Sequence, residues 1–422
     1  MKKTLPEFYY LTHFHEFLQT IGEHFAHLLR ESDQAFIREF QVAQQAEQAI
    51  IVRIINRSQP WVRRETLNYP EIPTWQQALA ALENKHWIGT ATTLINTNNL
   101  KSFLRVLTKS DLQRVYSDAD AAIALQIRKS ASKQHWLDAC SQLHHVTVRN
   151  LSIAKTFVAL HSDLETTIRY LLFIYFGRME TDFKQFSLRD LGIRTTHEQA
   201  IVTNESSPRY ASIAEAESAF YYSELRRLLA DGISEPFEVD AIEDWPAPIG
   251  HHAERLAASC RFYYGDALKV TNPQRACAIW RETLHPKAQE QAVRLLFQCG
   301  NHAAAIELAK AIIDDPLDDS LALFAEDFVA RKVGGKRTSI LTDLLRNSLP
   351  EVAIDEAYRG AVERGVMAWH ERHGRRCFHS ENNMWRALFV IFFWPELIDS
   401  KEGGFVSEFD RTPRLLQANS FY

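Results

Sequence analysis

The chain has 422 residues, of which 46% are hydrophobic, and its formal net charge is −5. This composition is typical of a globular protein with roughly two to four domains, and the charge excludes a basic field over the whole surface. The five cysteines form no Cys-x-x-Cys pair, which argues against a disulfide framework or a zinc knuckle. A reducing compartment such as the cytoplasm is therefore expected.

No membrane or export segment is predicted. The longest apolar run, Ala387 to Trp394, has eight residues, whereas a spanning helix needs about 20. At the N-terminus, Pro6 and Glu7 come before any apolar stretch, so we do not expect a signal peptide.

The N-terminal region is predicted to be a winged-helix-like DNA-binding module covering residues 1–90. Apolar spacing predicts helices over residues 11–29, 35–42 and 47–55, and the chain breaks at residues 59–60. The segment WVRRETLNY is predicted to be extended. Thr74, with Gln77 three positions later, is expected to cap a helix that ends near Leu82.

This region contains a group of basic and aromatic residues with two open interpretations. Four arginines and a tryptophan lie between Glu47 and Glu65 with no acid among them: Arg53, Arg57, Trp61, Arg63 and Arg64. Such a group can neutralise DNA phosphates while the indole stacks on a base. The alternative, which composition alone favours, is an ordinary solvated helix face and turn. The doublet Tyr9-Tyr10 could likewise contact DNA or cover the edge of the core.

Residues 91–150 are predicted to form a SAP-type DNA-binding element. Two helical patches, residues 101–115 and 132–143, are joined by a polar connector and a short alanine-rich helix. Bases outnumber acids from Lys101 to Lys133, but ordinary surface helices often show the same balance. The prediction that Lys133 binds DNA therefore depends on the SAP-like layout.

A helical linker domain over residues 151–245 is predicted to end in an acidic loop. Residues 231–244 contain six acids and no base, and a Trp-Pro-Ala-Pro run follows. Residues 246–350 are predicted to be a tetratricopeptide-like helical domain, because Ala304, Leu308, Ala311 and Pro316 have the spacing of the second helix of such a repeat. Helical arrays of this kind can also serve as scaffolds for other proteins.

Two further patterns could suggest chemistry. His13, His15, His24 and His27 have no carboxylate or cysteine at ligand spacing, so they are predicted to be surface histidines. Glu381, after the potential N-cap Ser380, begins an apolar helix predicted to lie in the core. The residues alone favour a structural role for Glu381, because the helix dipole stabilises an acid in this position by about 0.3–1 kcal/mol.

Four segments, taken together, resemble the Fanconi-associated nuclease family of structure-specific DNA nucleases, which carry a C-terminal VRR-NUC domain. They are PEFYYLTHFHEFL, VRIINRSQPWVRRETLNYPEI, LLFIYFGRMETDFKQFSLRDLGIR and FHSENNMWRALFVIFFW, and they follow the family's order from about Leu5 to Trp394. The resemblance implies a mostly α chain with the modules described above. It also implies that residues 351–422 are the N-terminal part of a PD-(D/E)xK-type nuclease domain.

The family activity is phosphodiester hydrolysis of 5′ flaps and related branched DNA, of the phosphodiesterase I type, with Mg²⁺ or Mn²⁺. Carried over by position, Glu381 matches the first acidic metal ligand of the nuclease core. The segments with Tyr9, Tyr10, Arg57, Arg63 and Arg64 match those that hold DNA.

The family core also needs Pro-Asp and Glu-x-Lys motifs, because several ligands must converge on the metal. No proline here precedes an aspartate, and the only Glu-x-Lys, Glu83-Asn84-Lys85, is N-terminal. The chain reaches Tyr422 within about 40 residues of Glu381. We therefore expect it to bind branched or 5′-flap DNA, and to associate with the nucleoid, without cutting.

Three explanations of the missing motifs remain open: a partial gene, a frameshifted allele, or a split enzyme whose nuclease module is a separate chain. The partners considered are a separate nuclease module and a second copy in a homodimer. The alternative function is a tetratricopeptide-like protein-interaction scaffold.

Overall fold

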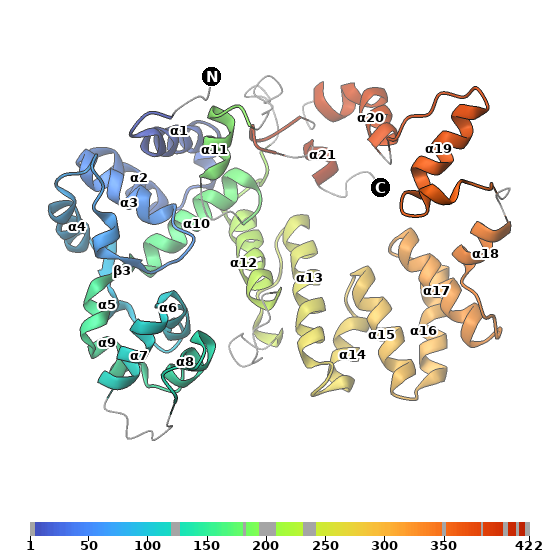
Figure 1. The fold of residues 1–422 in the computed structure, drawn as a ribbon, viewed down its shortest axis with the longest axis horizontal. Helices are drawn as coiled ribbons and strands as arrows, with labels where there is room; N and C mark the ends of the chain where they lie inside the picture. The colour runs from blue at the N-terminus through green and yellow to red at the C-terminus, as the bar shows by residue number, and fades with distance from the viewer. Residues whose placement is uncertain are drawn as a thin grey trace. The chain divides into compact units, whose positions relative to one another are not determined.

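The computed structural model describes residues 5–119, 127–179, 183–193, 208–230, 242–347, 352–380, 383–399, 404–410 and 413–417. These residues are mostly helical and include three short strands (Figure 1). The chain divides into two compact units, Met1–Glu217 with Lys401–Gln417, and Ser218–Ser400 with Ala418–Tyr422. The predicted boundary at residues 245–246 lies inside the second unit.

The first unit contains most of the short elements of the chain. In order they are α1 (Tyr9–His24), η1 (Ala26–Leu28), α2 (Glu31–Val42), α3 (Gln45–Ile55), β1 (Val62–Arg63), η2 (Arg64–Leu67), α4 (Trp75–Asn84), β2 (Ile88–Thr90), α5 (Ala91–Leu94), α6 (Leu100–Val106), α7 (Lys109–Asp118), α8 (Lys133–Cys140), α9 (His145–Asn150), η3 (Ser152–Thr156), β3 (Phe157–Leu160), α10 (Ser162–Phe176), α11 (Lys184–Asp190) and α21 (Arg414–Gln417).

The three helices predicted at the N-terminus are confirmed as α1, α2 and α3. The extended segment predicted after them is confirmed only for Val62 and Arg63, because Arg64–Leu67 turns into a 3-10 helix. Helix α4 is also confirmed, but the predicted side-chain cap is wrong: Thr74 makes no side-chain hydrogen bond to the helix start.

The strands form one antiparallel sheet in the order β1-β3-β2. Val62 lies opposite Val158, and Gly89 lies opposite Ala159. The central strand therefore comes from beyond the predicted SAP-type element, so residues 1–90 do not complete this sheet by themselves. Between β2 and β3, helices α5 to α9 enclose a separate hydrophobic core around Phe103.

The single helix predicted over residues 101–115 is in fact two helices, α6 and α7. They separate at Thr108, whose hydroxyl accepts the N–H of Asp111 at 3.1 Å while the Asp111 carboxylate accepts the N–H of Thr108 at 3.0 Å. This reciprocal capping box starts a new helix and explains the break. The polar connector and alanine-rich helix predicted after α7 fall largely on residues 120–126, which lie outside the described residues.

Helix α10 is the central buried helix of the first unit. Ten of its residues between Leu164 and Phe176 are buried. It ends at Gly177, which has a φ of +65° in the left-handed region that favours glycine. The guanidinium of Arg209 lies 2.0 Å from the position that a Cβ at residue 177 would take. Only glycine therefore allows this approach.

The second unit is a succession of helices. They are the greater part of α12 (Ile213–Ala230), then η6 (Ile242–Asp244), α13 (His251–Leu268), α14 (Pro273–Arg281), α15 (Pro286–Gln298), α16 (His302–Asp314), α17 (Asp319–Lys332), α18 (Ile340–Asn347), η7 (Glu356–Tyr358), α19 (Val362–Arg372), α20 (Asn383–Phe392) and the π turn η8 (Pro395–Asp399).

From α13 to α17 each helix packs on the next. On α16 the buried residues are Ala305, Ala309 and Ile312. Each of them lies one position after a residue of the predicted repeat pattern, which was Ala304, Leu308 and Ala311. The acidic loop predicted before this region falls mostly on residues 231–241, which lie outside the described residues.

The expectation that the apolar helix after Glu381 lies in the core is wrong. The helix exists as α20, but Trp385 is 66% exposed and Phe392 is 75% exposed. The reason is that the described part of the chain does not cover this face. Among the described residues, no helix combines the length and apolar character needed to cross a membrane.

Candidate nucleic-acid interface

Three of the predicted DNA-binding residues, Tyr9, Tyr10 and Arg57, line the same cavity in the first unit. The cavity has a volume of about 420 Å³. Its wall is built by the start of α1, the end of α3, the turn after it and the start of α11. The lining residues are Tyr9, Tyr10, His13, Arg53, Asn56, Arg57, Tyr69, Phe183, Lys184 and Ser187.

Arg53 is a fixed element of this cavity. Its guanidinium carbon lies 3.8 Å from the ring centroid of Tyr10 and 4.3 Å from that of Tyr69. The same group forms a 2.5 Å ion pair with Glu71, and the Tyr10 hydroxyl donates to Glu71 at 3.3 Å. The charge of Arg53 is therefore neutralised, and its stacking holds two tyrosine rings in place.

Burial and ion pairing determine the charge states of Arg53, Glu71 and Tyr10. Burial opposes ionisation of Glu71, but the hydrogen bonds from Arg53, the backbone and Tyr10, together with the charge of Arg53, outweigh it and hold the pKa of Glu71 below its usual range. Burial, partly offset by Arg53, raises the pKa of Tyr10 to about 12. At neutral pH the wall of the cavity therefore presents a neutral phenol and a compensated ion pair.

Arg57 carries the uncompensated charge. It is exposed, and it donates to the Tyr69 hydroxyl at 2.6 Å and to the carbonyl oxygen of Thr66 at 3.3 Å. No ion pair joins it to a carboxylate of the described residues. Lys184, which is also exposed, lines the same cavity. The cavity thus combines the charge of Arg57 with the half-buried rings of Tyr9 and Tyr69, a combination found in sites that bind single-stranded nucleic acid.

The structure does not bring Arg63 and Arg64 to this cavity. Arg63 pairs with Asp111 on α7 at 2.8 Å, and Arg64 pairs with Glu83 on α4 at 2.7 Å. Trp61 is only 5% exposed, and its ring packs edge-on against Phe103 at 5.3 Å. In this arrangement these three residues hold parts of the first unit together. The solvated helix face and turn considered from the sequence does not describe them, because Trp61 is buried and both arginines are paired. Their contact with DNA stays a prediction.

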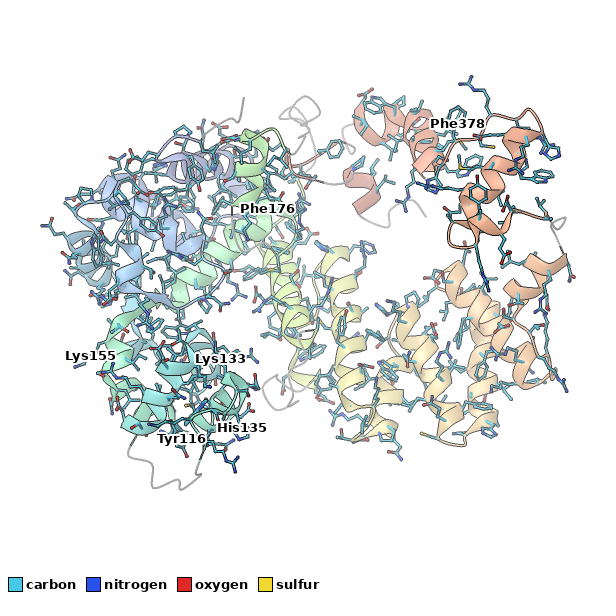
Figure 2. All side chains as sticks on the ribbon, viewed as in Figure 1. Tyr116, Lys133, His135, Lys155, Phe176 and Phe378 are labelled. Atoms are coloured by element: carbon cyan, nitrogen blue, oxygen red, sulfur yellow. The ribbon has the colours of Figure 1, made fainter. Side chains whose placement is uncertain are left out.

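Lys133 also lies apart from the cavity lining. It is exposed at the start of α8, where Figure 2 labels it. Its ammonium donates to the carbonyl oxygen of Arg105 at 3.1 Å. Ser132 caps the helix by accepting the N–H of His135. Lys133 can therefore contact a phosphate only at a place separate from the cavity.

Glu381 lies outside the described residues. Within the described ranges, no group of three or more histidine, cysteine, aspartate or glutamate side chains is arranged to hold a metal ion. His379, just before Glu381, forms a 2.8 Å contact with Glu363 of α19. These residues do not provide the set of oxygen ligands that Mg²⁺ requires.

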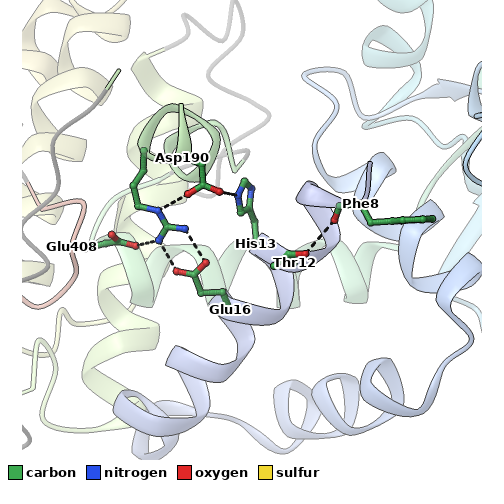
Figure 3. A network of polar contacts seen from close by, with 7 residues as sticks. Phe8, Thr12, His13, Glu16, Asp190 and Glu408 are labelled. Carbon is green, nitrogen blue, oxygen red and sulfur yellow. Dashed lines mark hydrogen bonds and ion pairs between the residues drawn. The ribbon is translucent and has the colours of Figure 1, made fainter. Parts of the chain in front are cut away.

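The prediction of surface histidines is wrong for His13. It is 2% exposed, and its Nε2 lies 2.7 Å from Asp190 on α11 (Figure 3). Arg189 extends the contact to Glu16 at 2.5 Å and to Glu408 at 2.6 Å. Sequence reasoning missed this network because its members come from three distant parts of the chain, and no local spacing signals it.

Comparisons with known proteins show what this chain is similar to. A family model described as the HTH domain of FAN1 matches residues 8–89. The Fanconi-associated nuclease 1 homolog of Pseudomonas aeruginosa is 25% identical over 438 residues, covering 99% of this chain and 74% of the relative. The Arabidopsis thaliana homolog is 21% identical over 486 residues, covering 98% of this chain and 52% of the relative.

Solved structures agree on the fold. A crystal structure of paFAN1 bound to DNA with a 2-nucleotide 5′ flap and a gap has a TM-score of 0.75 and 24% identity, covering 99% of this chain and 76% of that one. A second, with a 1-nucleotide flap, has a TM-score of 0.73 and 21% identity. The prediction of a mostly helical chain is confirmed. The N-terminal module, predicted to be winged-helix-like, matches an HTH domain.

Proposed function

Because this chain is a relative of the Fanconi-associated nucleases, we propose that it acts on flapped DNA as part of a structure-specific DNA repair nuclease. We propose that the first unit binds the DNA, and that the cavity lined by Tyr9, Arg57 and Tyr69 receives one nucleotide of it. Lys133 adds a backbone contact elsewhere on the same unit.

The uncompensated charge of Arg57 is the observation that carries this proposal. An exposed guanidinium attracts a phosphate and can donate charge-assisted hydrogen bonds to it. Arg57 has no carboxylate partner among the described residues, so its guanidinium can take this role. The tyrosine rings beside it can stack on a base, a contact worth about 1–3 kcal/mol. The volume of about 420 Å³ lies within the range of about 300–1,000 Å³ that is common for small-ligand sites.

The family reaction, phosphodiester hydrolysis, would require Mg²⁺ or Mn²⁺ to neutralise charge at the phosphate. Glu381 is the proposed first ligand, from its place in the HSEN segment. Since the described residues do not complete the ligand set, no catalytic step is assigned to them. The remaining ligands would come from a longer product, a separate nuclease module or a second copy.

A protein-interaction scaffold is the second candidate. It is supported by the way in which helices α13 to α17 pack one after another, as in a tetratricopeptide-like array. A partner that co-purifies with a chain lacking DNA affinity would favour this candidate over the first.

The test is fluorescence anisotropy with a labelled 5′-flap duplex and, for comparison, a blunt duplex of the same length. We expect tighter binding of the flap and a dissociation constant that rises steeply with salt, by a power of about 0.9 for each phosphate contact. Equal affinity for both duplexes would contradict the proposed preference for flapped DNA. Affinity that does not depend on salt would contradict the proposed phosphate contacts.

A further inference from the structure

Helix α11 has the candidate DNA cavity at one end and the returning C-terminal chain at the other. Lys184 and Ser187 line the cavity. Arg189 and Asp190, at the far end, enter the polar network of Figure 3. Seven helical residues span only about 10 Å, so the helix moves as one body.

His13 connects this network to the cavity. It lines the cavity, and its Nε2 contacts Asp190 at 2.7 Å, while its buried Nδ1 has no hydrogen-bond partner among the described residues. Its ring also stacks against Phe186 of α11, with centroids 5.6 Å apart. A bound nucleotide that holds His13 in place would therefore also hold α11, through a hydrogen bond and a ring contact.

The network also contacts the returning C-terminal chain at Gly404–Asp410, which we call the docked segment. Arg189 reaches it by a 2.6 Å ion pair with Glu408, a carboxylate whose side chain is 7% exposed. Phe409 is fully buried and packs against Phe186 with centroids 4.7 Å apart. Phe186 thus touches His13 on one side and the docked segment on the other.

The charged groups of the network depend on one another. One guanidinium, that of Arg189, holds three carboxylates: Glu16 at 2.5 Å, Asp190 at 3.0 Å and Glu408 at 2.6 Å. Three carboxylates repel one another unless the arginine stays between them. A shift of Arg189 therefore changes the contacts of all three together.

A second anchor holds the docked segment without touching α11. Asp410, 3% exposed, pairs with Arg209 at 3.0 Å and accepts the backbone N–H of Val406 at 2.9 Å and of Ser407 at 3.2 Å. The segment thus keeps its own shape, and it contacts α11 through Arg189 and Phe186. Phe409 also packs against Tyr175 and Phe176 of α10.

We propose that α11 couples the two sites, so that a ligand in the cavity and docking of Gly404–Asp410 each strengthen the other. The docked segment follows α20 and the stretch with Glu381 in the chain. The identity of the cavity ligand as DNA rests on the proposed function, whereas the coupling itself does not.

The test with DNA uses Glu408→Gln, which keeps the side-chain shape and removes the charge that Arg189 holds. Its matched control is Glu243→Gln, which breaks the exposed Glu243–Arg275 ion pair of the second unit. Because binding effects are reciprocal, we expect Glu408→Gln to weaken affinity for the 5′-flap duplex by about fivefold or more. The control should bind as the unaltered protein does. Equal affinity of both variants would overturn the coupling.

The test without DNA reads the docked segment directly by amide hydrogen exchange. His13→Phe removes the contact with Asp190, and we expect exchange in Gly404–Asp410 to become at least about fivefold faster. Glu243→Gln should leave it unchanged. If exchange were also unchanged in His13→Phe, the coupling would be wrong. If exchange responds but the unaltered protein binds no DNA, only the proposed function fails.

Discussion

Arg53 and Glu71 form a 2.5 Å ion pair at the wall of the candidate DNA cavity, and the same arginine stacks on two tyrosine rings. The pair is more than a surface salt bridge, because the side chain of Glu71 is only 8% exposed and that of Arg53 is 23% exposed. Arg53 thus supports the shape of the cavity, whereas Arg57 provides its charge.

The first prediction separates these two roles. Arg53→Lys keeps the positive charge but loses the flat group that stacks on Tyr10 and Tyr69, so each ring contact of about 0.5–1 kcal/mol is weakened. We expect affinity for the 5′-flap duplex to fall about tenfold with an unchanged salt dependence. Anisotropy titrations at several salt concentrations measure both. A changed salt dependence would show that Arg53 itself contacts a phosphate.

The second prediction concerns acid stability. Glu71 and Asp190 both have a lowered pKa in the folded protein. Burial opposes their ionisation, but hydrogen bonds to each carboxylate, together with the charges of Arg53 near Glu71 and of Arg189 near Asp190, outweigh it. A lowered pKa adds stability above the unfolded pKa of about 4, and this is lost as pH falls through the folded pKa. Denaturant unfolding from pH 6 to pH 3 should therefore show the loss below about pH 4.

The matched variant for this measurement is Glu71→Gln. It cannot release or bind a proton at residue 71, so its stability should fall less steeply over the same acid range. An identical slope in the variant and the unaltered protein would show that Glu71 does not contribute.

The third prediction tests the close approach of Arg209 to Gly177. Alanine at residue 177 would be strained by the φ of +65° and would push Arg209 away from Asp410. Gly192→Ala is the control, since Gly192 has a φ of +70° and nothing within 4 Å of the place that an added methyl group would occupy. We expect a loss of about 1 kcal/mol in the control and about 3 kcal/mol or more for Gly177→Ala. Equal losses in denaturant unfolding would contradict this account.

The fourth prediction concerns the exposed face of α20. Trp385→Ser and Phe392→Ser together should change the free energy of unfolding by no more than about 0.5 kcal/mol per site, because both side chains are exposed. Binding of a hydrophobic dye should fall, since a large apolar patch is removed. A strong loss of stability in the double variant would show that this face is covered.

The sequence is informative where the signal is local. The helical spacing of residues 11–29, 35–42 and 47–55 predicts α1 to α3, because burial of one face follows directly from the pattern. The interpretation of Tyr9, Tyr10 and Arg57 as DNA-binding candidates is possible because all three belong to this N-terminal region. Their convergence on one cavity could not be predicted without the packing of α1 against α3.

Other features depend on contacts between distant residues. Nothing near Arg63 or Arg64 in the sequence reveals Asp111 or Glu83, so the four arginines of the cluster could not be told apart. The local sequence predicts a surface position for His13 because its partner, Asp190, is 177 positions away. The composition of α20 predicts a core helix, but burial also requires a covering surface, which composition does not describe.

The central claim, that Arg57 brings an uncompensated charge to DNA, is tested most directly by comparing Arg57→Ala with Arg64→Ala. Both variants remove one arginine from the same cluster, but Arg64 is paired with Glu83 and lies off the cavity. With the 5′-flap duplex, the account predicts that Arg57→Ala weakens binding and lowers the salt slope by about 0.9, while Arg64→Ala keeps both close to those of the unaltered protein. Equal salt slopes for the two variants, or a loss only in Arg64→Ala, would contradict it.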